Sequence, residues 1–150
     1  MATSDTSDPS KSVLSSLRGW GQSSMPPMGL ATLITALHTR PFARLPMLLF
    51  TPMLLFSSYL NVAGYKIDAA GLSAAWSGLY VLLAARRRPV AGLRQRFSAR
   101  GAVRAAAMGL GGMNLLSGGF VYATGNRAAE IEERKERDRW GIESAREERK

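Results

Sequence analysis

The sequence predicts an all-α membrane protein with three transmembrane helices, a polar N-terminal segment and a charged C-terminal helix. Three runs without a charged residue, at residues 45–63, 69–85 and 105–125, predict the transmembrane helices. About twenty helical residues, rising about 1.5 Å each, cross a bilayer core of about 30 Å. Between the last two runs, residues 86–104 hold seven arginines and no acid. A dense basic loop between two apolar runs is typical of a topological anchor in a membrane protein.

The charge and composition of the chain agree with this class. The formal net charge of the 150 residues is +9, and the seven arginines of the loop at residues 86–104 account for most of it. A basic balance otherwise favours nucleic-acid binding, but the neighbours of this loop are apolar rather than amphipathic, so we expect no nucleic-acid partner. The chain has no cysteine and one histidine, His38. These counts exclude disulfide frameworks, thiolate zinc sites and multi-histidine sites, and we expect no cofactor.

Residues 1–44 form the predicted polar N-terminal segment. It is serine-rich up to residue 22 and contains Asp5 and Asp8, whereas a cleaved mitochondrial presequence is arginine-rich and poor in acids. Residues 29–37 are apolar but too short to span a bilayer. Two interpretations of this stretch have equal weight. It is either a short helix lying at the membrane interface or a buried helix packed against a partner.

The predicted transmembrane domain covers residues 45–125. In its first span, Pro46 suits a first helical turn, and Pro52 is expected to kink the helix. The five-residue turn at 64–68 makes the first two spans antiparallel neighbours. Trp76 lies near the middle of the second span, where we expect it to pack against protein. The second span also places four residues on one face at helical spacing: Ala70, Ala74, Ser77 and Val81.

The third span carries two faces of small residues. One face contains Ala105, Gly109, Gly112, Gly119 and Ala123, interrupted by Leu116. The adjacent face contains Ala107, Gly111, Asn114 and Gly118. Small residues let helix backbones approach closely in lipid, and a polar side chain can bond across the contact. We therefore predict helix packing on two sides, through Gly109, Gly112, Gly119 and Asn114 in particular. Because three spans offer few internal partners, part of this surface is expected to contact other membrane subunits.

Residues 126–150 form the predicted charged helical tail. Opposite charges recur at helical spacing, as in the pairs Glu130–Arg134 and Glu133–Arg137. Each such pair stabilises a solvated helix by about 0.2–0.5 kcal/mol. The large apolar residues of the tail form no continuous stripe, which argues against a coiled coil. Of two interpretations, a solvated helical tail and an arm laid on a partner, the sequence favours the solvated tail.

The sequence shows no motif for catalysis or ion transport. The glycines at 109–112 lack the final glycine of a dinucleotide-binding loop, because Asn114 takes that position and no strand precedes it. A proton or ion relay needs ionisable residues inside the spans, and the three runs contain none. A carrier usually shows internal repeats and polar groups at the midplane, and neither is visible. We therefore expect no enzyme, no pump and no small-molecule substrate.

Two blocks of the membrane domain carry a resemblance to a known family. They are AGLSAAWSGLYVLLAARRR at residues 70–88 and GMNLLSGGFVYATG at residues 112–125. The matching positions are Gly71, Trp76, Ser77, Leu79, Tyr80 and Asn114. Over residues 45–125 the chain resembles the fungal "altered inheritance of mitochondria" family, the nineteenth of that named series. The resemblance implies a small multi-pass mitochondrial membrane protein, and it supplies no catalytic residues.

These features lead to an expected function. We expect a non-catalytic accessory subunit of a mitochondrial respiratory-chain complex that supports assembly or stability. NADH:ubiquinone oxidoreductase (complex I) is the first choice, because it carries many small supernumerary membrane subunits. The alternative is a free-standing inner-membrane assembly or morphology factor.

The expected orientation follows from the basic loop. The arginine loop is expected to face the matrix with residues 1–44 beside it, and the tail to face the intermembrane space. Basic pockets on the matrix side bind cardiolipin head groups, and we place such a contact at Arg86, Arg87 and Arg88.

Overall fold

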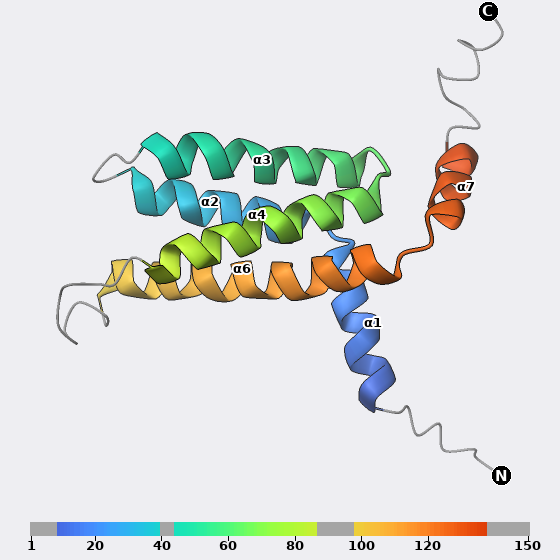
Figure 1. Cartoon of the computed structure of the whole chain (residues 1–150), viewed down its shortest axis with the longest axis horizontal. Helices are drawn as coiled ribbons and strands as arrows, with labels where there is room; N and C mark the ends of the chain where they lie inside the picture. The colour runs from blue at the N-terminus through green and yellow to red at the C-terminus, as the bar shows by residue number, and fades with distance from the viewer. Residues whose placement is uncertain (1–8, 40–43, 87–97, 138–150) are drawn as a thin grey trace, which may run out of the picture.

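The computed structural model of the chain describes residues 9–39, 44–86 and 98–137. All the regular structure in these residues is helical, so the predicted all-α class is confirmed for them (Figure 1). The helices are α1 (Pro9–Gly21), α2 (Met25–His38), α3 (Arg44–Val62), α4 (Lys66–Arg86), α6 (Ala99–Thr124) and α7 (Arg127–Arg137). Helices α2, α3, α4 and α6 lie alongside one another as a bundle, and α1 and α7 leave it (Figure 1).

Helices α3, α4 and α6 occupy the three predicted apolar runs. Among the described residues, α4 is the helix that is both long and apolar enough to cross a membrane, with a mean hydropathy of 1.4. The apolar part of α3, Pro46–Val62, is shorter, and the helix runs through Pro52 without a break. Three transmembrane helices therefore remain a proposal.

Helix α6 begins at Ala99, six residues before the apolar run that predicted it. The Ser98 hydroxyl accepts a hydrogen bond from the Gly101 backbone N–H at 3.2 Å. Such a cap satisfies one of the free N–H groups of a first helical turn, so the helix starts there. As a result Arg100 and Arg104, which the sequence placed in the basic loop, lie inside the first turns of α6.

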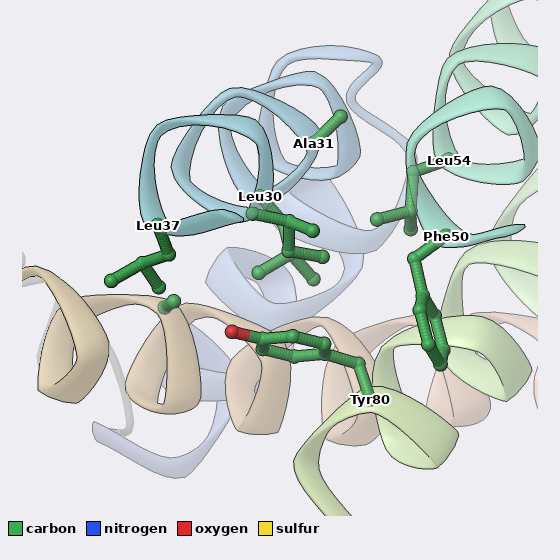
Figure 2. Close-up of a cluster of buried hydrophobic side chains, with 8 residues drawn as sticks. Leu30, Ala31, Leu37, Phe50, Leu54 and Tyr80 are labelled. Atoms are coloured by element: carbon green, nitrogen blue, oxygen red, sulfur yellow. The ribbon is translucent and has the colours of Figure 1, made fainter. Parts of the chain in front are cut away.

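Helix α2 is the buried member of the bundle. Two prolines, Pro26 and Pro27, stand in its first turn, where a missing N–H costs little. Leu30 and Ile34 are fully buried in a cluster that also contains Phe50 of α3 and Tyr80 of α4 (Figure 2). Of the two interpretations of residues 29–37, the structure supports the buried helix. The partner that covers it is the rest of this chain, mainly α3 and α6.

The bundle has two unlike ends (Figure 1). We call one the arginine end, where α2 and α4 finish and α3 and α6 begin. We call the other the turn end, where Gly64 joins α3 to α4. Gly64 has φ of +96°, and its neighbour Tyr65 donates its N–H to the Leu60 carbonyl at 2.9 Å. This left-handed glycine and its backward hydrogen bond are the usual way to end a helix sharply.

Helices α1 and α7 both lie at the turn end (Figure 1). The sequence predicts that all of residues 1–44 lie on the side of the arginine loop, whereas α1 lies at the opposite end of the bundle. The reason is α2, which runs antiparallel to α3 and carries the chain from the turn end to the arginine end. Its start is level with Ser58 of α3, whose hydroxyl donates to the Ser24 carbonyl at 3.0 Å. Its end is level with Arg100 of α6.

Candidate membrane and partner interface

One small-residue face of α6 forms a tight seam with α4. A Cβ added at Gly118 would lie 2.6 Å from the Ala70 carbonyl oxygen. A Cβ added at Gly111 would lie 2.8 Å from a Val81 methyl and 3.5 Å from the Ser77 carbonyl oxygen. The four α4 residues predicted to share a face, Ala70, Ala74, Ser77 and Val81, all contact these two glycines. Glycine is therefore required here so that the two backbones can approach.

The other small-residue face of α6 is open. Apart from the adjacent residues and backbone of α6 itself, no heavy atom of the described residues lies within 4 Å of the Cβ position at Gly109, Gly112 or Gly119. Leu116, which interrupts this face, is 66% exposed. No described helix of this chain thus packs against these glycines as predicted. A contact with another protein remains the prediction for this surface, which we call the open glycine face.

Asn114 and Trp76 lie inside the helix contacts. The Asn114 side chain is buried, and its oxygen accepts a hydrogen bond from the Trp20 indole N–H of α1 at 3.0 Å. Its amide nitrogen has no partner among the described residues. Asn114 also lines a hollow of about 10 Å³, which is about the room that one water molecule needs. Trp76 packs edge-on against Phe50 of α3, with ring centroids 5.9 Å apart.

The interior of the bundle is small and partly polar, whereas its surface is large and apolar. The buried polar side chains are Ser57, Ser58, Ser73, Ser77, Asn114 and Ser117. The exposed large apolar side chains of α3, α4 and α6 include Leu48, Leu55, Phe56, Val62, Leu82, Leu83, Met113 and Leu116. In a protein that folds in water, large apolar residues are usually inside and contiguous exposed apolar patches are small. This surface instead fits a surrounding of lipid or of other membrane helices.

At the arginine end, two arginines of α6 cap the ends of neighbouring helices. An Arg100 guanidinium N–H donates to the Leu37 carbonyl at 3.2 Å, and one of Arg104 donates to the Ala84 carbonyl at 2.6 Å. Both carbonyls belong to last turns, which lack helical partners. The negative end of a helix dipole also favours a cation. Both arginines lie shortly before the predicted helix start at residue 105, where a cation is unfavourable unless it contacts another group.

The predicted cationic lipid contact lies at the same end. Arg86, the last residue of α4, is exposed to solvent. Arg87 and Arg88 lie outside the described residues. The structure therefore places one member of the predicted set at the rim of the bundle, beside the capped end of α4.

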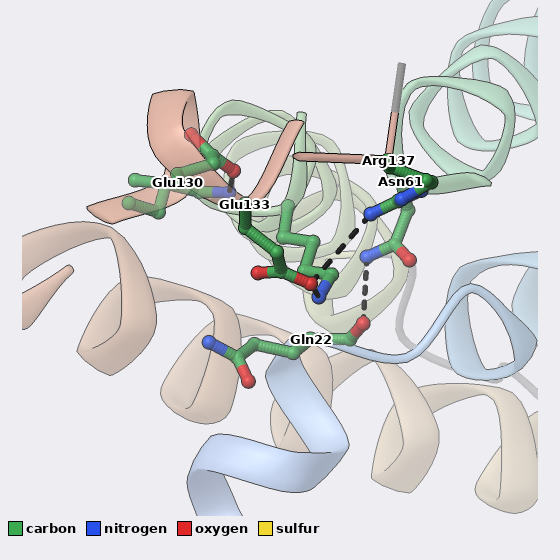
Figure 3. Close-up of polar contacts among 7 residues, drawn as sticks. Gln22, Asn61, Glu130, Glu133 and Arg137 are labelled. Atoms are coloured by element: carbon green, nitrogen blue, oxygen red, sulfur yellow. Dashed lines mark hydrogen bonds and ion pairs between the residues drawn. The ribbon is translucent and has the colours of Figure 1, made fainter. Parts of the chain in front are cut away.

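At the turn end, α7 docks on the start of α4 (Figure 3). The Glu130 carboxylate accepts a hydrogen bond from the Ile67 backbone N–H at 2.7 Å, in the first turn of α4. Glu133 pairs with Lys66, and the hydrogen bond and charge of Lys66 lower the pKa of the Glu133 carboxyl. The Arg134 guanidinium lies over the Tyr65 ring, 4.1 Å from its centroid. Of the helical tail predicted at residues 126–150, Arg127–Arg137 is helical, and residues 138–150 lie outside the described residues. The sequence did not predict that this helix contacts α4.

The turn end also contains a polar hollow of about 240 Å³ between α1, α4 and α7. Its charged lining consists of two bases and two acids, namely Arg18, Lys66, Glu130 and Glu133. The acids already pair within the chain, so the lining does not favour an ion of either sign. In the part of the chain that the structure describes, no three acidic, histidine or cysteine side chains gather as a metal site.

Comparison with protein-family models, with curated proteins and with solved structures finds no match to this chain. The resemblance carried by Trp76, Tyr80 and Asn114 therefore stays an expectation. The chemistry of the described residues is that of helix packing, helix capping and contact with an apolar surrounding.

Proposed function

We propose that this chain is a membrane protein without catalytic activity, whose role is to pack against other membrane subunits. The observation that carries the proposal is the inverted distribution of its side chains. Serines and Asn114 are buried between the helices, while leucines such as Leu82 and Leu116 are about two-thirds exposed. Such a bundle gains less from folding in water than one with a fully apolar core, because many of its large apolar side chains stay outside. In lipid the same apolar side chains can stay on the surface, because the acyl chains around them are equally apolar.

The lengths of α4 and α6 that carry no charge form an uncharged belt around the bundle, and the height of this belt supports a membrane location. In α4 the residues from Ala69 to Ala85 carry no charge, and α6 is uncharged from Ala105 to Thr124. Seventeen to twenty residues of helix correspond to about 25–30 Å, close to the thickness of a bilayer core. Charged groups border the belt at both ends. We propose that α3, α4 and α6 cross the bilayer and that α2, which packs inside the bundle they form, also takes the chain from one side of the membrane to the other.

The partner is proposed to be a large respiratory-chain complex, NADH:ubiquinone oxidoreductase in first place. The open glycine face supports an accessory role, because Gly109, Gly112 and Gly119 offer a close approach that the described helices do not use. The choice of complex rests on the resemblance and on the many small membrane subunits of that enzyme. We propose no substrate and no cofactor.

The proposed location is the mitochondrial inner membrane, with the arginine end facing the matrix. Helices α1 and α7 then both lie on the intermembrane-space side, because both are at the turn end. A cardiolipin head group is proposed to bind at Arg86 together with Arg87 and Arg88. Replacing all three arginines with glutamine is expected to lower the amount of cardiolipin that copurifies with the protein. Unchanged lipid retention would count against this site.

Native gel electrophoresis of mitochondrial membranes tests the proposed role. The chain is expected to migrate with the mature oxidoreductase. A Gly112→Leu variant, which fills the open glycine face, is expected to insert in the membrane but leave the complex. The matched control is Ala75→Leu, which adds the same side chain at an exposed position of α4. Purified oxidoreductase without any peptide from this chain would refute the subunit role. Migration with intermediates alone would favour the assembly-factor alternative.

A further inference from the structure

Helix α1 leaves the bundle sideways rather than along it. Figure 1 shows α1 crossing α6 near the turn end and extending away at a steep angle to the bundle helices. The crossing is close, because a Cβ added at Gly21 would lie 2.6 Å from the Ser117 carbonyl oxygen and 2.8 Å from a Val121 methyl. If the bundle crosses a bilayer, a helix in this direction lies in the membrane plane.

The two sides of α1 differ in character. Val13, Leu14, Leu17 and Trp20 fall in one stripe of the helix at i, i+1, i+4 and i+7. Ser15 lies on the opposite side, and Lys11 and Arg18 border the stripe next to Leu14. The apolar stripe is not covered by the described residues, since Val13 is 59% exposed and Leu14 is 48% exposed. The helix contains two basic residues and no acidic one.

Two contacts with α6 show which side of α1 faces the middle of the bundle. Trp20 donates its indole N–H to Asn114, whereas the Arg18 guanidinium lies 6.0 Å from the Phe120 ring centroid. Asn114 and Phe120 are six residues apart, or about 9 Å along α6, and Phe120 is nearer the turn end. Trp20 therefore points toward the bilayer middle and Arg18 toward the aqueous rim. Val13 lies two turns from Trp20 on the same side, and Lys11 lies two turns from Arg18.

The depth of the crossing fits the boundary between acyl chains and head groups. The backbone of α1 crosses α6 at Gly21, whose neighbours Ser117 and Val121 precede the end of the uncharged run at Gly125 by eight and four residues. This separation is about 6–12 Å along α6. An amphipathic helix that lies on a membrane buries its apolar face about 5–10 Å into that boundary.

We propose that α1 is an in-plane amphipathic helix that binds the lipid surface at the turn end, with its apolar stripe in the acyl region and Lys11 and Arg18 at anionic head groups. The proposal rests on the membrane location of the bundle. The basic residues of α1 favour an anionic lipid surface over a neutral one. Its Trp20–Asn114 hydrogen bond fixes the depth and the rotation of the helix relative to α6.

Spin labelling at single cysteines tests this inference directly, because the native chain has no cysteine. The full chain is reconstituted in phosphatidylcholine–cardiolipin bilayers with one label at Val13→Cys or Ser15→Cys. Collisions with oxygen report lipid exposure, and collisions with a water-soluble nickel chelate report water exposure. The ratio of oxygen to nickel accessibility is expected to be severalfold higher at position 13 than at position 15. A label at Leu82→Cys, on the exposed surface of α4, reports whether the bundle itself is in lipid.

Each outcome is decisive. Equal, water-like ratios at positions 13 and 15 with a lipid-like ratio at position 82 overturn the in-plane helix and leave the membrane location intact. A water-like ratio at position 82 overturns the membrane location itself. A label at position 13 that is shielded from both collision partners reports a protein contact, and it also overturns the lipid assignment.

Discussion

A methyl group added on the open glycine face of α6 should raise the stability of the bundle. A methyl group added on the face that packs against α4 should lower it. Gly119 is on the open glycine face, so Gly119→Ala meets no neighbour and gains the helix propensity of alanine, about 0.8–1.0 kcal/mol. Gly118→Ala gains the same propensity but places a Cβ 2.6 Å from the Ala70 carbonyl oxygen and 3.2 Å from the Ala74 Cβ. These contacts are with backbone and with a short side chain, so neither can rotate away.

The seam must therefore widen, by roughly half an ångström, and overpacking of this kind costs about 1–3 kcal/mol. The free energy of unfolding of Gly118→Ala is expected to fall below that of Gly119→Ala by this amount. Both can be measured by denaturing-detergent titration in mixed micelles, with helical circular dichroism as the signal. Equal free energies of unfolding for the two variants would refute the assignment of the internal and open faces.

Three further predictions concern the contacts of α1 and α7. Trp20→Phe removes the hydrogen bond to buried Asn114 and is expected to cost about 1–3 kcal/mol in the same titration, and adding Asn114→Leu should recover part of the loss. Glu130→Gln removes the anion at the first turn of α4, worth about 0.3–1 kcal/mol, and should speed amide hydrogen exchange in that turn. The pKa of Glu133 is lowered by Lys66, so its contribution to α7 docking is complete above the ordinary carboxyl pKa and is lost as the pH falls through the lowered value. Hydrogen exchange of α7 against pH should show this loss, and Lys66→Gln should remove it, because docking then no longer lowers the pKa of Glu133.

The apolar pattern predicted the central helices well, because hydrophobic runs of this length have few other structures available. The run at residues 69–85 became α4, and the shared face that includes Ala70 and Ser77 became its seam with α6. Both small-residue faces of α6 were visible in the sequence, but the sequence did not say which one is internal. Which face of α6 packs against α4 depends on how the two helices are rotated relative to each other, and a single sequence does not contain this information.

Long-range contacts account for what the sequence did not predict. Helix α1 was not predicted from the sequence, because the segment is rich in serine. The spacing of Val13, Leu14, Leu17 and Trp20 nevertheless indicates an amphipathic helix. Arg104 looked like part of a loop because a charge-free run defined the expected helix, whereas the Ser98 cap starts the helix earlier. Glu130 had a local partner in sequence, Arg134, but it bonds to Ile67, which is 63 residues away.

These contacts together explain why we propose α6, and not α4, as the helix that binds a partner. Helix α4 is fixed at both ends by side chains of the sign that its dipole favours, with Glu130 at its first turn and Arg104 at its last. Its small face is filled by Gly111 and Gly118 of α6. Because Arg104 can reach the end of α4 only across a close seam, the cap and the seam support each other. Helix α6 contributes to both and still has a second face of small residues that contacts nothing in the described chain. A close helix contact from another subunit can therefore form on that face without disturbing any interaction that holds the bundle together.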